Sequence, residues 1–173
     1  MKDAVLVVNA GSSTLKYALY TANFDCLAHD HIDTADPGAA LGGILARLQG
    51  QYNLAGAGHR VVHGGDLYAE PVMVNDAVMR ELDKLQPLAP LHQPANLACI
   101  RAVAKALPSL AQVACFDTAF HQTQPEIARW FALPRALYEA GVKRYGFHGL
   151  SYEYVASRLP QALGRHASGK VIV

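Results

Sequence analysis

Residues 113–121, VACFDTAFH, are the part of the sequence that most strongly indicates the fold. The four apolar residues at 113–116 predict a short buried strand, because an apolar run of this length is typical of a sheet interior. The strand would deliver Asp117 to its carboxyl end, with His121 four residues later. Open α/β sheets bind their ligands at the carboxyl ends of their strands. The stretch therefore predicts an α/β domain with a functional site where Asp117 emerges.

Other patterns supply the remaining strands and the helices that would pack against them. Apolar runs predict further strands at residues 4–8, 15–20, 26–31 and 57–63. Apolar residues at helical spacing predict helices at residues 37–48, 75–85, 93–107, 125–133, 134–140 and 151–163. A short polar connection between the first two strands indicates an antiparallel hairpin.

The composition is that of a globular domain without a strong overall charge. The chain has 173 residues, 51% of them hydrophobic and 17% charged, and a formal net charge of +1. This balance provides no basic field for nucleic acid, so any anion must be bound by individually placed groups. No segment approaches the ~20 apolar residues of a membrane helix. Three cysteines without CxxC spacing are typical of reduced thiols, and we expect a cytoplasmic protein without nucleic-acid or membrane partners.

The last residues, 169–173, resemble the beginning of another buried strand. We therefore expect residues 1–173 to form a single domain whose last strand is cut off, as in a piece of a longer polypeptide.

Residues 9–16, NAGSSTLK, are the first cluster with chemical potential. Gly11 allows close approach of the backbone to a ligand, and Ser12, Ser13 and Thr14 offer hydroxyl and amide donors near the cationic Lys16. Together they could hold phosphate oxygens, although the pattern is not GxxxxGK followed by a helix. The alternative is an ordinary polar hairpin.

Arg60 and His92 belong to two further clusters. Arg60 interrupts an otherwise apolar strand in HRVVHGG, residues 59–65, where an unpaired charge would be expensive. It could bind a carboxylate or phosphate through paired hydrogen bonds, or it could be paired with an internal acid. His92 precedes a predicted helix, where it could contact an anion or act as a capping residue.

The last cluster, RYGFHG at residues 144–149, presents a histidine on a glycine-rich loop before a helix. Gly146 and Gly149 bracket Phe147 and His148, and the alternative is that His148 caps the helix near Ser151. The whole set comprises phosphate donors, a buried arginine, an acid at a strand end and a histidine on a loop. Such a set suits phosphoryl transfer, in which catalysis consists of positioning and charge stabilisation.

Five ordered stretches of the chain resemble the N-terminal motifs of the acetate kinase family. They are VLVVNAGSSTLKYAL (5–19), HRVVHGG (59–65), APLHQPANL (89–97), FDTAFHQTQP (116–125) and RYGFHGLSYEYV (144–155). The related propionate kinases share them, and the family belongs to the superfamily of acetate and sugar kinases, actin and heat-shock-chaperone ATPases. The resemblance implies a ribonuclease-H-like, actin-like ATPase domain with a mixed sheet flanked by helices. It would be the first of two such domains, and the C-terminal nucleotide-binding domain would lie beyond this chain.

The resemblance also implies a reaction and residue roles. The implied reaction is the reversible, direct in-line transfer of a phosphoryl group from ATP to acetate, which gives acetyl phosphate and ADP. The implied cofactor is Mg²⁺, and the implied full-length assembly is a homodimer. The implied roles are Asp117, His148 and Arg60 in catalysis; Lys16, Ser12, Ser13 and Thr14 at ATP phosphates; Arg60, His92, Val62, Leu91 and Phe147 at the substrate; and Asn9 and Asp117 at the metal.

Several departures from the family pattern leave alternatives open. The family usually has Asn where Gln93 stands, and Thr and His where Leu150 and Tyr152 stand. The segment between residues 20 and 58 is shorter than usual. The alternatives are a propionate kinase or a catalytically silent fragment that acts only as a binding module.

Overall fold

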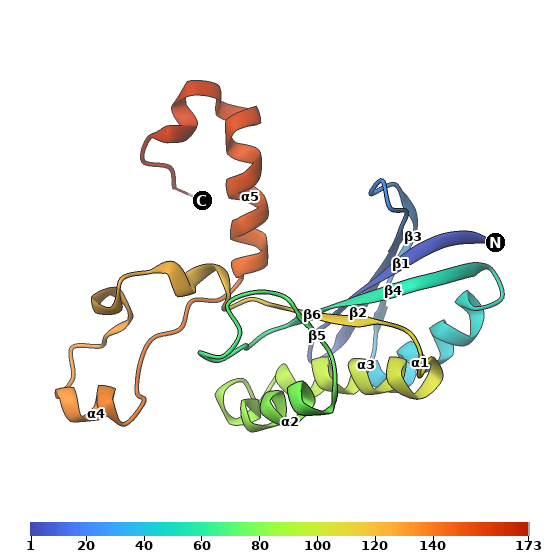
Figure 1. The fold of residues 1–173 in the computed structure, drawn as a ribbon, viewed down its shortest axis with the longest axis horizontal. Coiled ribbons are helices and arrows are strands. Elements are labelled where there is room, and N and C mark those ends of the chain that lie inside the picture. The colour runs from blue at the N-terminus through green and yellow to red at the C-terminus, as the bar shows by residue number, and fades with distance from the viewer. Residues whose placement is uncertain (173) are drawn as a thin grey trace.

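The computed structural model describes residues 1–172 and forms an α/β fold around one six-stranded sheet (Figure 1). The strands are β1 Lys2–Ala10, β2 Thr14–Tyr20, β3 Cys26–Asp33, β4 Tyr52–Val61, β5 Val72–Met73 and β6 Gln112–Phe116. The α-helices are α1 Pro37–Leu48, α2 Asp76–Lys84, α3 Gln93–Ala106, α4 Arg135–Glu139 and α5 Gly149–Leu163. Short 3₁₀ turns occupy Gln86–Leu88, Phe120–Thr123, Glu126–Arg129 and Gly164–Ser168.

The sheet is mixed, with strand order β3-β2-β1-β4-β6-β5. Strands β1, β2 and β3 form an antiparallel meander, and β4 and β6 run parallel to β1. The short β5 lies antiparallel to β6 at the far edge. The predicted α/β fold and hairpin are therefore confirmed, and β1, β4 and β6 end at the same edge of the sheet.

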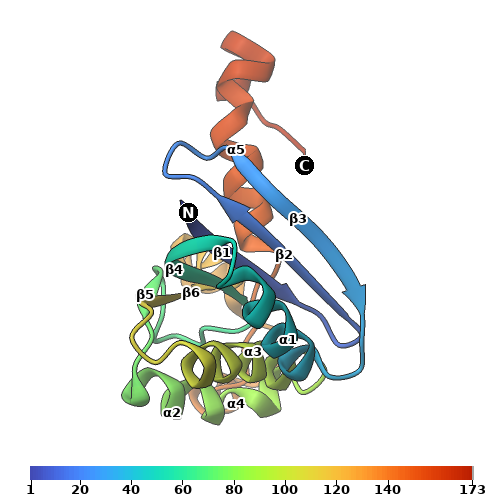
Figure 2. The same cartoon turned by 90° about the vertical axis from the view of Figure 1, so that its right-hand side faces the viewer.

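One face of the sheet carries the core and the other is largely open. Alternate residues of β1, among them Leu6 and Val8, are buried towards α1 and α3, because side chains of a strand alternate between the two faces. On the opposite face Val5 and Val7 remain about 40% exposed (39% and 40%). Figures 1 and 2 show α1, α2 and α3 together on one side of the sheet, while α5 projects away from it.

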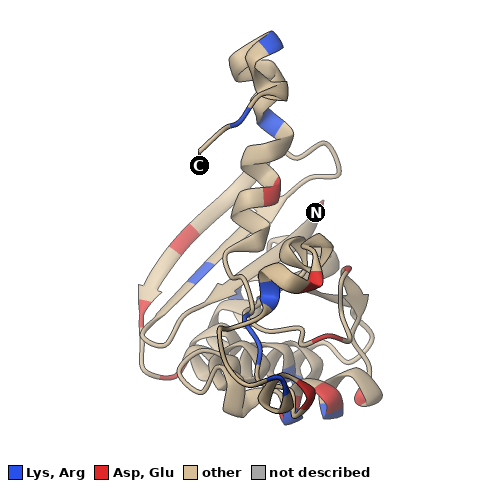
Figure 3. Ribbon diagram, turned by 90° about the vertical axis from the view of Figure 1, so that its left-hand side faces the viewer, with Lys and Arg blue, Asp and Glu red and all other residues tan. Residues whose placement is uncertain are grey.

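Local capping explains where the first two helices begin. Asp36 accepts a hydrogen bond from the Ala39 amide at 2.9 Å, and Pro37 occupies the first turn of α1, where its missing N–H costs nothing. Asn75 caps α2 by accepting from the Val78 amide at 2.9 Å. Figure 3 shows acidic and basic positions mixed along the chain, in keeping with the net charge of +1.

Three predictions need correction. The predicted helix at 125–133 is only the 3₁₀ turn Glu126–Arg129, and α4 covers less than the predicted 134–140. Residues 170–172 are irregular, because α5 leads the chain away from the sheet and no strand lies beside them. Residue 173 of that predicted strand lies outside the described residues. Within residues 1–172 no helix is both long and apolar enough to span a membrane.

Candidate active site

A cavity of about 370 Å³ opens where β4 and β6 end, at the edge that the sequence predicted. It receives residues from four separate stretches of the chain. Seven predicted site residues line it: Arg60, Val62, Leu91, His92, Asp117, Phe147 and His148. The structure thus brings together all of the proposed catalytic and substrate-binding positions.

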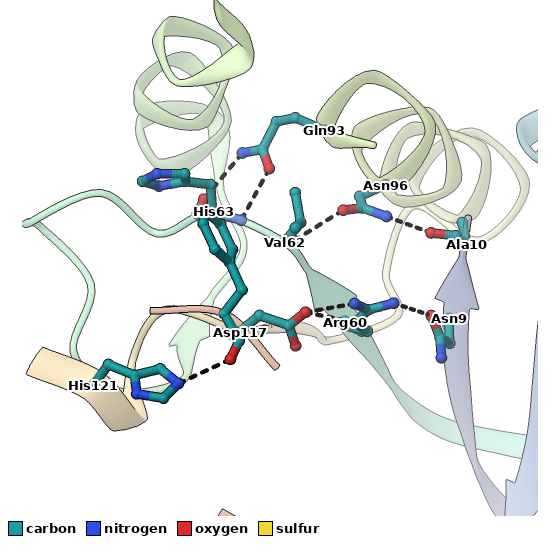
Figure 4. Close-up of polar contacts among 10 residues, drawn as sticks. Asn9, Ala10, Arg60, Val62, His63, Gln93, Asn96, Asp117 and His121 are labelled. Atoms are coloured by element: carbon teal, nitrogen blue, oxygen red, sulfur yellow. Dashed lines mark hydrogen bonds and ion pairs between the residues drawn. The ribbon is translucent and has the colours of Figure 1, made fainter. Parts of the chain in front are cut away.

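The charged centre of the cavity is an arginine held between two oxygen groups (Figure 4). Arg60 Nε donates to Asp117 Oδ2 at 3.0 Å and Nη2 donates to the same oxygen, while Nη1 donates to Asn9 Oδ1 at 3.0 Å. Asp117 is only 1% exposed, whereas Arg60 is half-buried. The internal acid considered for Arg60 is therefore Asp117 itself. Because β4 and β6 are parallel neighbours, their ends place the two groups side by side.

Apolar residues line the same cavity as this ion pair. Val62 follows β4, Leu91 precedes α3 and Phe147 belongs to the loop before α5, and all three line the cavity. A carboxylate with a short alkyl chain would therefore meet the guanidinium at its charged end and these side chains at its apolar end.

The loop that carries His148 is fixed tightly to the end of β6. His148 has φ 58°, a left-handed conformation that costs a non-glycine residue roughly 1–2 kcal/mol. The Gly149 amide donates to the Asp117 carbonyl at 2.8 Å, and His121 Nε2 lies 2.9 Å from the Phe147 carbonyl oxygen. His148 occupies the N-cap position of α5 but makes no side-chain cap hydrogen bond. His148 lines the cavity, and its side chain does not have the capping role considered for it.

The predicted phosphate hairpin lies beside the cavity and does not line it. The Gly11 amide donates to the Thr14 carbonyl at 2.7 Å, which closes the turn between β1 and β2. Lys16 is paired with Asn9 across the two strands, so both side chains lie on the open face of the sheet. Lys16 contributes to a separate shallow depression with residues of β3, including His29 and His31.

Asn9 and Asp117 could contribute to a magnesium site. An amide oxygen and a carboxylate are hard ligands, and Mg²⁺ commonly uses one or two carboxylates together with water and substrate phosphates. Residues 1–172 contain no group of three or more His, Cys, Asp and Glu side chains arranged to hold a metal. Asn9 and Asp117 would thus supply two oxygen ligands, and water and substrate phosphates would supply the others.

Sequence reasoning missed several residues that support the cavity from behind. Gln93 and Asn96, in the first turn of α3, are 0% and 3% exposed and hydrogen-bond to the ends of β1 and β4. The sequence pattern that could have identified them is the position of two carboxamides on the same helix face as the apolar Leu97 and Ile100. His63 Nδ1 accepts from the Gly65 amide at 2.9 Å, and burial lowers the pKa of His63.

The aromatic residues around the His148 loop form a second support. The His63 ring meets Tyr145 edge-on at 4.5 Å and Phe147 at 5.6 Å between centroids. Tyr152, one of the departures from the family pattern, lies edge-on to His121 at 5.5 Å. These contacts hold the loop against the turn after β4 and the segment after β6.

Comparisons with known proteins agree with this geometry. The model of the acetokinase family matches residues 28–173. An acetate kinase of Rhodopseudomonas palustris (strain TIE-1) is 46% identical over 208 residues, covering 100% of this chain and 52% of that protein. Since 208 aligned residues exceed the 173 of this chain, the relative has residues that this chain lacks.

Solved structures show the same fold. The acetate kinase of Porphyromonas gingivalis superposes with a TM-score of 0.81 at 36% identity, over 94% of this chain and 49% of that one. A propionate kinase from Francisella tularensis gives 0.79 at 30% identity, over 94% and 49%. The chain therefore spans about half the length of the relatives it matches. On these matches, the chain belongs to the acetokinase family.

Proposed function

We propose that this chain provides the acceptor side of an active site that transfers a phosphoryl group between ATP and acetate. One observation carries the proposal: the Arg60–Asp117 pair lies in a cavity that Val62, Phe147 and His148 also line. The family supports the same reaction, because acetate kinases and a propionate kinase are among the relatives.

The reaction requires two anions to approach each other. An acetate oxygen attacks the γ-phosphorus, the bond from phosphorus to the β,γ-bridging oxygen breaks, and ADP leaves with that electron pair. Arg60 would bind the acceptor carboxylate and offset its repulsion with the phosphoryl group. Asp117 and Asn9 would hold the guanidinium in the required orientation. His148 would donate a hydrogen bond to the transferring group, and His92 would lie beside the acceptor.

The other partners belong to the same proposal. Mg²⁺, held by Asn9 and Asp117, would neutralise phosphate charge when bound. Ser12, Ser13, Thr14 and Lys16 would contact the phosphates of ATP from the hairpin. We further propose a homodimer as the full-length assembly. The three cysteines are free thiols, which supports a reducing, cytoplasmic location.

Propionate is the second candidate acceptor, supported by the Francisella tularensis propionate kinase among the structural relatives. Val62, Leu91 and Phe147 would contact the alkyl group. One methylene in such a pocket discriminates by only about 1–3 kcal/mol, so the two acids are close competitors. The third alternative is a silent binding module.

A hydroxamate assay for acetyl phosphate tests the proposal. The chain would be assayed alone and joined to the part of the Rhodopseudomonas palustris acetate kinase that follows the aligned region, with acetate and with propionate. We expect the joined protein to form acetyl phosphate and Arg60→Ala to lower its kcat about 10²–10³-fold, as loss of a transition-state donor does. Arg101→Ala is the matched control, because Arg101 pairs with Asp83 on an exposed surface away from the cavity.

Each outcome discriminates between the candidates. Equal activity of Arg60→Ala and Arg101→Ala would refute the role of Arg60. Acyl phosphate formed faster from propionate would favour the second acceptor. A folded joined protein with no turnover on either acid would leave the silent binding module as the better description.

A further inference from the structure

A side chain bridges the parallel strands β1 and β4 at their carboxyl ends. Their register pairs Val8 with His59, so the next ladder bond would run from the Val62 amide to the Ala10 carbonyl. Instead, the Val62 amide donates to Asn96 Oδ1 at 2.9 Å, and Asn96 Nδ2 donates to the Ala10 carbonyl at 2.7 Å. The carboxamide of Asn96 thus stands where a direct backbone hydrogen bond would be (Figure 4).

Gln93 forms similar hydrogen bonds to the backbone of His63, the residue after Val62. Its Oε1 accepts from the His63 amide at 3.2 Å and its Nε2 donates to the His63 carbonyl at 3.0 Å. The same Nε2 lies 3.4 Å from the Leu82 carbonyl at the end of α2. Gln93 therefore pairs with both backbone groups of His63, as a neighbouring strand would, while the chain turns away from the sheet.

These two carboxamides stand directly behind the charged centre of the site. Asn9 and Arg60 precede the bridged positions on β1 and β4, and the hydrogen bond from Arg60 Nη1 to Asn9 Oδ1 spans the same gap between the strands. Asn96 is 3% exposed and has its acceptor and one donor satisfied by backbone, so its orientation is determined. The width of the gap therefore follows from the size of a carboxamide.

We propose that Asn96, supported by Gln93, is a positioning residue that sets the separation of Asn9 and Arg60 and so directs the Arg60 guanidinium into the cavity. Its consequence for substrate binding rests on the proposed function. Without the Asn96 carboxamide the ends of β1 and β4 can close or splay, and the Arg60 guanidinium then loses either Asn9 or Asp117. Displacement of a positioned group by about 1 Å can cost about a hundredfold in rate.

Nuclear magnetic resonance of the chain itself provides the direct test. In Asn96→Ala we expect the Val62 amide to exchange with solvent about tenfold faster, and the Arg60 Nε resonance to shift because its bonds rearrange. Asn96→Asp is the second variant, since it keeps an acceptor for Val62 but loses the donor to Ala10. Asn75→Ala is the control: it removes the cap of α2, costs about 1 kcal/mol, and lies away from the cavity.

Acetate titration adds a readout that a purely structural role would not move. We expect Asn96→Ala to bind acetate about tenfold more weakly than the parent, and Asn75→Ala to bind it as the parent does. An unchanged Arg60 Nε resonance in both Asn96 variants, despite faster Val62 exchange, would overturn the proposal. Equal weakening of acetate binding in Asn96→Ala and Asn75→Ala would also overturn it.

The proposed function and this inference can fail separately. If the parent chain binds no acetate, the acceptor role of this cavity fails, and the Arg60 resonance alone decides whether Asn96 positions the guanidinium. If Asn96→Ala does not fold, Asn96→Asp gives the same two resonance readouts.

Discussion

His59, the residue before Arg60, faces the opposite side of the sheet and is buried in the core at 1% exposure. Its Nε2 lies 2.8 Å from Gln112 Oε1, and its Nδ1 has no hydrogen-bond partner within the described chain. Burial lowers the pKa of His59 from 6.5 to about 4, and the Gln112 hydrogen bond opposes this only in part. The strand thus carries a neutral histidine towards the core and a charged arginine towards the site.

This burial makes stability depend on pH. Below pH 6.5 the unfolded chain binds a proton at residue 59, whereas the folded chain does not until about pH 4. The unfolded state therefore binds more protons, and the free energy of unfolding falls as pH drops from 6.5 towards 4. The shift corresponds to about 3 kcal/mol over that interval. We expect His59→Gln to remove this part of the slope in urea denaturation curves recorded between pH 7 and 4.

In His59→Gln the free energy of unfolding will still depend partly on pH, because burial also lowers the pKa of His63. His166, in the exposed 3₁₀ turn Gly164–Ser168, is the matched control, and His166→Gln should leave the slope of the parent intact. Identical slopes for the parent and His59→Gln would contradict the burial argument.

At the scale of elements, two glycines allow the His148 loop to lie against β6. A Cβ atom at Gly149 would collide with the Asp117 carbonyl oxygen, and one at Gly146 with the His121 ring. A backbone carbonyl cannot move aside as a flexible side chain can. We expect Gly149→Ala to lower the free energy of unfolding by about 1–3 kcal/mol, measured by urea denaturation.

Gly43 provides the opposite case for comparison. It lies inside α1 with no atom within 4 Å of a Cβ built on it. Because alanine favours helices, Gly43→Ala should raise the free energy of unfolding by about 0.5–1 kcal/mol. If both substitutions changed stability in the same direction, the close approach at Gly149 would not be what constrains the loop.

Elements with strong local signals could be predicted from the sequence. Helix α1 has its predicted bounds, Pro37–Leu48, because a capping acid, a proline and regular apolar spacing all agree. The two-residue β5 could not be predicted, since Val72–Met73 is too short to show a period and depends on its pairing with β6. The predicted helix at 125–133 exceeded the observed turn Glu126–Arg129, none of whose residues is buried, so burial of an apolar face does not stabilise a longer helix there.

The candidate site could be predicted to a similar extent. Arg60 and Asp117 were identifiable because charges in or after apolar strands need partners. Gln93 and Asn96 were not, because a carboxamide in the first turn of a helix has the same local pattern whether it caps the helix or bridges two strands. Only the tertiary fold brings Ala10 and Val62 to either side of Asn96.

The molecule as a whole divides into a packed sheet region and a sparsely packed C-terminal region. Helix α3 buries six residues against the sheet and α1, whereas α5 buries only Gly149 and contains Pro160. Figures 1 and 2 show α5 extending away from the sheet. Tyr154 and Ile172 are 66% and 100% exposed. Beyond the first turn of α5, where Gly149 and Tyr152 contact the segment after β6, the helix has little tertiary packing. A helix of this length with so little packing is marginal in water, so its stability should fall well below that of the core.

Native-state hydrogen exchange tests this division. We expect α5 amides to exchange through local opening at a free energy near zero, while α3 amides exchange only near the free energy of global unfolding. Limited proteolysis should cleave within residues 151–172 first and leave the sheet region folded, as judged by unchanged protection of β1 and β4. Protection of α5 equal to that of α3 would contradict this, since it would require contacts on the exposed face of α5. An excess of the Rhodopseudomonas palustris C-terminal part, supplied in trans, should raise α5 protection only if that part packs on this face.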